Sequence, residues 1–113
     1  MKEILPWVLG LAVVAALAWA MGRSRGPSEA RQWVADGAVL VDVRSPAEFA
    51  SGHIEGAINV PVDQVASRVD AIGPADKAVV VYCRSGGRSA AATATLKAKG
   101  RTRVFDLGPM SAW

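Results

Sequence analysis

The chain has 113 residues, of which 51% are hydrophobic and 20% charged, and its formal net charge is +3. This length accommodates one folded domain rather than two. The single cysteine excludes an internal disulfide framework, and one histidine beside one cysteine argues against a structural zinc site, so we expect neither metal nor cofactor. The small net charge does not support nucleic-acid binding.

Residues 4–21 form an unbroken run without a charged or polar side chain. As a helix, this run would be about 27 Å long, close to the roughly 30 Å hydrocarbon core of a bilayer. Trp7 and Trp19 lie near its two ends, where aromatic rings favour the headgroup region. Positive charge is concentrated after the run, at Arg23, Arg25 and Arg31. The pattern predicts a single-pass anchor in the inner membrane, with the following domain facing the cytoplasm.

A cleaved signal peptide is the alternative interpretation of the same segment. Ala18 and Ala20 flank Trp19 in the small-residue pattern of a cleavage site, and cleavage would release a periplasmic protein. Against this alternative, the region before the run has one lysine offset by one glutamate. We therefore predict a membrane anchor at 1–21, a linker at 22–27 and a folded domain at 28–113.

The first half of this domain begins with a short helix. Ser28 can cap it, and Gly37 ends it. Residues 38–43 read as a buried strand. Ser45 and Glu48 then form a capping box around Pro46, which predicts a brief helix directly after that strand.

The second half alternates in the same way. Residues 57–60 predict a short strand, and the apolar residues of 62–72 have the spacing of one helical face. Residues 78–82 are the most apolar strand, 89–99 an alanine-rich helix and 103–107 a last strand. We predict an α/β domain with a mostly parallel sheet of four or five strands and helices on both faces. We interpret the basic residues near the end of the alanine-rich helix as a solvated face; they are Lys97, Lys99, Arg101 and Arg103.

The only thiol, Cys83, follows the most apolar strand, at the sheet edge where parallel α/β folds place their ligand sites. Gly86 and Gly87 allow backbone N–H groups to converge into an anion-binding nest, and the next helix adds its positive N-terminus. Arg84 and Arg88 flank the thiol. Such surroundings favour a thiolate, without a neighbouring histidine as base.

Three ordered segments together resemble the signature of a single-domain rhodanese. They begin at Asp42, at Gly52 and at Cys83, and the resemblance covers essentially residues 28–113. It implies an α/β fold and sulfane-sulfur transfer, in which the cysteine takes sulfur from thiosulfate or a similar anionic donor. Cyanide, a thiol or a thioredoxin-like protein would accept the sulfur.

The resemblance also implies roles for individual residues. Cys83 is the expected nucleophile and persulfide carrier. Asp42 and Arg44 match a strand-end pair that supports the loop, and His53 is expected to be a structural group. The substrate-binding active loop comprises Arg84, Ser85, Gly86, Gly87 and Arg88.

One position departs from the family pattern, because Pro109 replaces the second glycine of a common Gly-Gly ending. Proline fixes φ and removes an N–H, so we expect this departure to affect substrate preference more than the fold. Two other functions stay open. One is a membrane-tethered sulfur-relay or binding module without small-molecule turnover. The other is thiolate phosphatase or arsenate reductase chemistry, which the short spacing from Cys83 to Arg88 disfavours.

Overall fold

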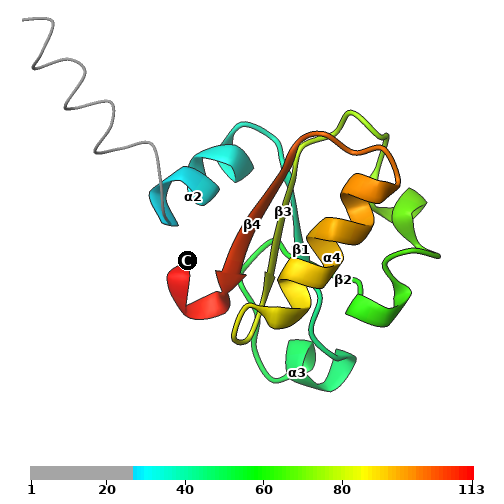
Figure 1. The fold of residues 1–113 in the computed structure, drawn as a ribbon. Coiled ribbons are helices and arrows are strands. Elements are labelled where there is room, and N and C mark those ends of the chain that lie inside the picture. The colour runs from blue at the N-terminus through cyan, green and yellow to red at the C-terminus, as the bar shows by residue number, and fades with distance from the viewer. Residues whose placement is uncertain (1–26) are drawn as a thin grey trace, which may run out of the picture.

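A computed structural model describes residues 27–113 as a four-stranded parallel sheet between two layers of helices (Figure 1). The strands are β1 (Val39–Asp42), β2 (Ile58–Asn59), β3 (Val79–Cys83) and β4 (Val104–Pro109). They lie in the order β2-β1-β3-β4, and every neighbouring pair is parallel. The predicted α/β class and parallel sheet are therefore confirmed.

Helices and turns connect these strands. The α-helices are α2 (Pro27–Ala35), α3 (Pro46–Ala50) and α4 (Gly87–Ala98). The 3-10 helices are η1 (Val62–Gln64), η2 (Val69–Ile72) and η3 (Met110–Ala112). No helix within residues 27–113 is long and apolar enough to cross a membrane. The predicted anchor at 4–21, the alternative signal peptide and most of the linker lie outside the described residues.

Alternation along the strands gives the sheet two apolar faces. Val79, Val81 and Cys83 point into one core with Ala92 and Leu96 of α4. Val80 and Tyr82 point into the other core, which includes Ala30 of α2 and partly buried residues of η3. All five residues of β3 are buried, as the sheet's position between two layers requires.

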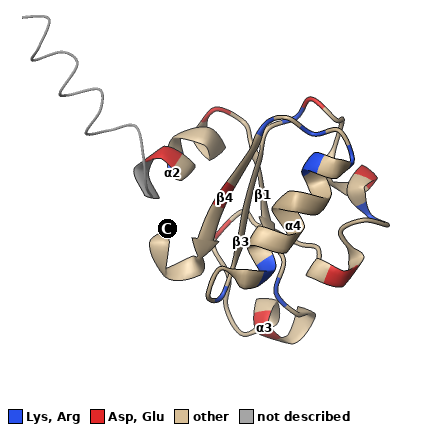
Figure 2. Ribbon diagram, viewed as in Figure 1, with Lys and Arg blue, Asp and Glu red and all other residues tan. Residues whose placement is uncertain are grey.

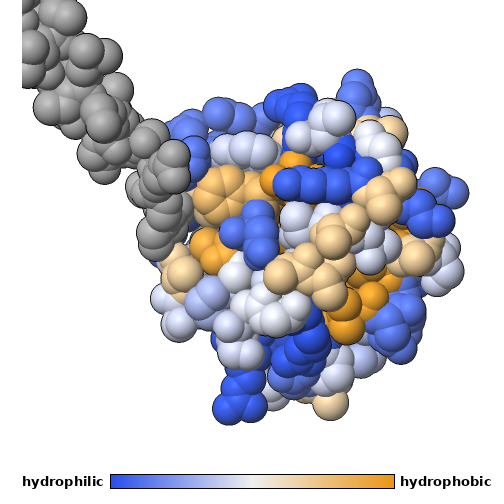
Figure 3. Space-filling view, in the orientation of Figure 1, coloured by the Kyte–Doolittle hydropathy of each residue, from blue (hydrophilic) through white to orange (hydrophobic). Residues whose placement is uncertain are grey.

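Charged positions gather in the loops and helices, and the strands carry few of them (Figure 2). On the face shown in Figure 3, hydrophilic positions interrupt the apolar ones. Ile58, on the short edge strand β2, is the exposed large hydrophobic residue of the described part, with 37% of its surface accessible.

The prediction of one helix over residues 62–72 is wrong. Two 3-10 turns, η1 and η2, replace it. The apolar spacing still serves the core, because Val65 and Ile72 are buried, whereas Ala66 is exposed. The pattern therefore identified the buried side but not the continuity of the helix.

Three further details depart from the sequence-based expectations. α2 begins at Pro27, so Ser28 lies within the helix rather than before it. α4 begins at Gly87, two residues before the predicted start. Arg101 is not part of a solvated face. It is 3% exposed and donates hydrogen bonds to the carbonyls of Val69, Gly73 and Pro74.

Candidate active site around Cys83

Cys83 ends the central strand β3 and lies buried beneath the turn that leads into α4. The backbone N–H of Gly86 donates to Cys83 Sγ at 3.0 Å. Gly86 has φ of +108°, a left-handed conformation that strains any other residue, and it is the N-cap of α4. The glycine at this position therefore allows the chain to turn back over the sulfur.

The surroundings of the thiol favour its ionised form. Burial alone raises the pKa of Cys83, but hydrogen bonding from Ser89 and from the N–H groups of the loop outweighs burial and lowers that pKa from its ordinary value. The largest of these contributions comes from the backbone of Ser89, followed by its side chain and by the backbone N–H groups of Gly86 and Ser85. The lowered pKa was predicted. The arginines, however, are not among the groups that lower it most.

Ser89 is a site residue whose role the sequence did not indicate. Its side chain is buried, and its hydroxyl donates to the carbonyl of Gly86 at 3.0 Å. This bond fixes the turn that carries the N–H directed at the sulfur. The sequence signal that could have identified Ser89 is its hydroxyl, in the first turn of an otherwise alanine-rich helix.

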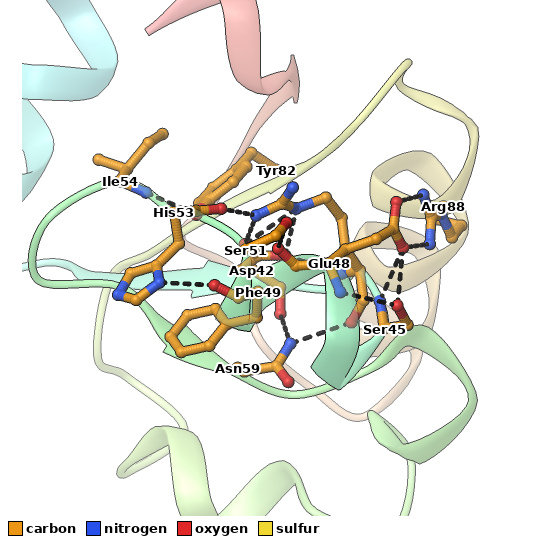
Figure 4. Close-up of polar contacts among 12 residues, drawn as sticks. Asp42, Ser45, Glu48, Phe49, Ser51, His53, Ile54, Asn59, Tyr82 and Arg88 are labelled. Atoms are coloured by element: carbon orange, nitrogen blue, oxygen red, sulfur yellow. Dashed lines mark hydrogen bonds and ion pairs between the residues drawn. The ribbon is translucent and has the colours of Figure 1, made fainter.

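The two arginines of the loop lie in different surroundings. Arg84 is exposed, and within residues 27–113 it has no hydrogen-bond or ion-pair partner. The Arg88 side chain instead points to α3 (Figure 4), where Nη1 and Nη2 contact Glu48 Oε1 and Oε2 at 2.7 and 3.1 Å. Hydrogen bonding between them lowers the pKa of Glu48 and raises the pKa of Arg88.

Glu48 also closes the predicted capping box of α3. Its Oε1 accepts hydrogen bonds from the backbone N–H and the hydroxyl of Ser45, each at 3.0 Å. The Ser45 hydroxyl in turn accepts from the Glu48 N–H at 3.2 Å. The capping box was predicted and is confirmed, but the sequence did not indicate that its carboxylate also holds Arg88.

Asp42 and Arg44 form a buried pair at the end of β1. Arg44 Nη2 lies 2.7 Å from Asp42 Oδ2, and Arg44 Nε lies 3.0 Å from both carboxylate oxygens. Arg44 also donates to the carbonyl of Gly52 at 2.7 Å, and its guanidinium lies 5.9 Å from the ring centroid of Tyr82. The pair thus braces the loop after α3 and the residue before Cys83, on the opposite face of the sheet from the thiol.

The remaining groups at this edge are structural. Burial, together with the nearby Asp42, raises the pKa of Tyr82 to about 12, and its hydroxyl accepts the N–H of Ile54 at 3.1 Å. His53 stacks on Phe49, with ring centroids 3.7 Å apart, and its Nδ1 lies 2.8 Å from the Phe49 carbonyl oxygen. These contacts fit the structural role expected of His53.

Pro109 lies beside the active loop. A bulge shifts the register between β3 and β4, so that Pro109 pairs with Cys83. A Cβ placed on Gly86 would lie 3.9 Å from Pro109 Cδ. Arg88, at the end of the loop, also lines a cavity of about 260 Å³, together with Val43, Ser45, Pro46 and residues 61–64.

Comparison with known proteins agrees with this geometry. The family model described as a rhodanese-like domain matches residues 26–113. The chain belongs to the rhodanese family. A sulfurtransferase of Allochromatium vinosum is 46% identical to this rhodanese domain over 76 residues, which cover 66% of this chain and 70% of the relative. The thiosulfate sulfurtransferase 16 of Arabidopsis thaliana is 40% identical over 111 residues, covering 80% and 89%.

A solved structure shows the same fold. A rhodanese from E. coli, described with anions, superposes with a TM-score of 0.65 at 32% identity, covering 68% of this chain and 92% of that chain. The sulfurtransferase relatives support transferase activity for this rhodanese domain.

Proposed function

We propose that this rhodanese is a sulfurtransferase that carries sulfane sulfur as a persulfide on Cys83. The observation that carries the proposal is the hydrogen-bonded nest around Sγ, which lowers the pKa of the thiol. A thiolate is the form of cysteine that attacks sulfur. The persulfide formed on it would also be an anion, and the same N–H groups would hold it.

The reaction divides into two balanced steps. The Cys83 thiolate attacks the outer sulfur of thiosulfate, a new S–S bond forms, and the original S–S bond breaks with its electron pair leaving on sulfite. In the second step cyanide or a thiolate attacks the outer sulfur of the persulfide. Thiocyanate or a new persulfide leaves, and the Cys83 thiolate is restored. The buried position of Sγ favours a slender terminal sulfur atom over a bulky disulfide as donor.

Turnover and relay are distinguished by the acceptor. A steady-state assay with thiosulfate and cyanide is expected to produce thiocyanate with the wild-type chain and none with Cys83→Ser, because serine cannot form a persulfide. Sulfur loading without thiocyanate production would instead favour a relay to a protein partner. Hydrolysis of a phosphate ester by the wild-type chain would contradict the proposal.

The geometry gives a reason to prefer sulfur transfer over phosphatase chemistry. A phosphatase loop needs its terminal arginine directed at the bound oxyanion. Here both Nη groups of Arg88 are engaged by Glu48. Four residues separate Cys83 from Arg88, and such a short loop suits a single sulfur atom better than a tetrahedral anion.

We also propose that residues 4–21 anchor the domain in the inner membrane with the thiol facing the cytoplasm. The charge asymmetry around the apolar run supports this topology. Membrane fractionation with mass spectrometry and protease access in spheroplasts tests it. An intact amino terminus and a protected domain are expected, whereas a mature terminus at Met21 or digestion from outside would contradict the proposal.

A further inference from the structure

Arg88, at the end of the active loop, carries a charge that the carboxylate of Glu48 already compensates. It belongs to α4, whereas its partner Glu48 lies forty positions earlier in α3. Both contacts are direct, and they form a bidentate pair, the geometry in which arginine recognises a carboxylate most strongly. An arginine held in this way is fixed in both position and orientation.

The carboxylate is itself held in place. Oε1 accepts from Ser45 as well as from Arg88, so the capping box of α3 sets the direction from which Glu48 meets the guanidinium. α3 in turn follows β1, the strand directly beside β3. A chain of contacts therefore runs from the sheet through α3 to the residue that closes the active loop.

The three arginines at this edge of the sheet therefore differ in how far their charges are compensated. Arg44 is paired with Asp42, and Arg88 with Glu48. Arg84 has no such partner in the described part of the chain. The charge of Cys83 still acts on Arg88 and raises its pKa, while Arg44 opposes this effect. Asp63 of η1 is the other charged residue that lines the cavity beside Arg88.

We propose that Glu48 is a positioning residue for sulfur transfer. It holds the Arg88 side chain in place at the end of the active loop and offsets its charge. This inference rests on the proposed sulfurtransferase function. It assigns the attraction of the anionic donor to Arg84 and the shape of the loop to the Glu48–Arg88 pair. The two arginines, which the sequence presents as equivalent, thus have separate tasks.

The test removes each charge alone and both together. Glu48→Gln keeps a side chain that the capping box accepts but removes the negative charge. The free charge of Arg88 should then strengthen thiosulfate binding, lowering KM about threefold, as for the loss of one partly exposed charge. The pH midpoint for sulfur loading should fall. Arg88→Gln leaves Glu48 unpaired, so KM and the midpoint should both rise.

The double variant decides between charge and structure. Glu48→Gln with Arg88→Gln restores neutrality, so KM should return to within about twofold of wild type and the pH midpoint to its wild-type value. The kcat should be lowered in both single variants and in the double variant, because none of them holds the loop end in place. Arg88→Lys keeps the charge without the bidentate contact, and it should lower kcat with little change in KM. Glu55→Gln is the matched control, since Glu55 is exposed and carries the same charge.

The outcomes separate this inference from the proposed function. If the wild-type chain takes up no sulfur from thiosulfate, the proposed function fails. If it takes up sulfur but the two single variants move KM and the pH midpoint in the same direction, or not at all, the positioning role of Glu48 is overturned. Melting temperatures of the full-length variants show whether a lost kcat merely reflects unfolding.

Discussion

The buried pair of Asp42 and Arg44 should be a principal source of stability at the end of β1. Asp42 has no exposed surface, and its two carboxylate oxygens accept from the Arg44 backbone N–H, Nε and Nη2 at 2.7 to 3.0 Å. Replacing Asp42 by asparagine removes the charge and part of these bonds while the guanidinium remains buried. Removing one partner of a buried pair costs about 3–5 kcal/mol.

Asparagine keeps one acceptor oxygen, so we expect Asp42→Asn to cost about 3 kcal/mol, the lower end of that range. For a domain of this size each kcal/mol shifts the melting temperature by about 4–8 °C, which gives a decrease of roughly 12–24 °C. Thermal and urea unfolding of the full-length chain, followed by circular dichroism, measures this loss. Asp70→Asn, at an exposed position, is the control.

A second substitution tests the reason for the loss. Arg44→Met in the Asp42→Asn background removes the unpaired guanidinium, so the double variant should lose less stability than the sum of the two single variants. A loss below about 1 kcal/mol for Asp42→Asn would refute the assignment of a strong buried pair. Additive losses would show that the two side chains stabilise the domain independently.

Three further results are expected. The rate of sulfur loading from thiosulfate should rise with pH and level off below the ordinary thiol pKa of about 8.5, because the thiolate is the reactive form and the pKa of Cys83 is lowered. A midpoint at or above about 8.5 would contradict the stabilisation of the thiolate by the N–H groups of the loop. Gly86→Ala should cost about 1–2 kcal/mol in urea unfolding because of its positive φ, whereas Gly87→Ala, with open space and no positive φ, should be neutral or slightly stabilising. Folding lowers the pKa of Glu48, so its contribution to the free energy of unfolding is fully present above the unfolded pKa of about 4.3 and is lost as the pH falls below it. The free energy of unfolding should therefore decrease less steeply in acid for Glu48→Gln than for the wild-type chain.

Local patterns predicted the elements that depend on neighbouring residues. The capping box at Ser45 and Glu48 was predicted because its hydrogen bonds join positions three apart. The run at 78–82 was predicted as a strand because a parallel sheet covered on both faces needs continuous apolar residues. The thiol's position followed from the same strand, together with the glycines after it.

Contacts between distant segments were not predictable in this way. Nothing in the spacing of residues 84–88 indicates that Arg88 turns to a carboxylate forty positions earlier. Arg101 has the same sequence environment as its exposed basic neighbours, yet tertiary packing buries it against three carbonyls. The apolar spacing at 62–72 could not separate one helix from two 3-10 turns, since both place Val65 and Ile72 on the same side.

The intact mass of the full-length chain after incubation with thiosulfate tests the central claim most directly. We expect a gain of one sulfur atom on the wild-type chain, its removal by cyanide with release of thiocyanate, and no gain on Cys83→Ser. Cys83 is the only cysteine of the chain, so no other thiol can carry the added sulfur. An unchanged wild-type mass, or an equal gain on Cys83→Ser, would contradict the persulfide mechanism.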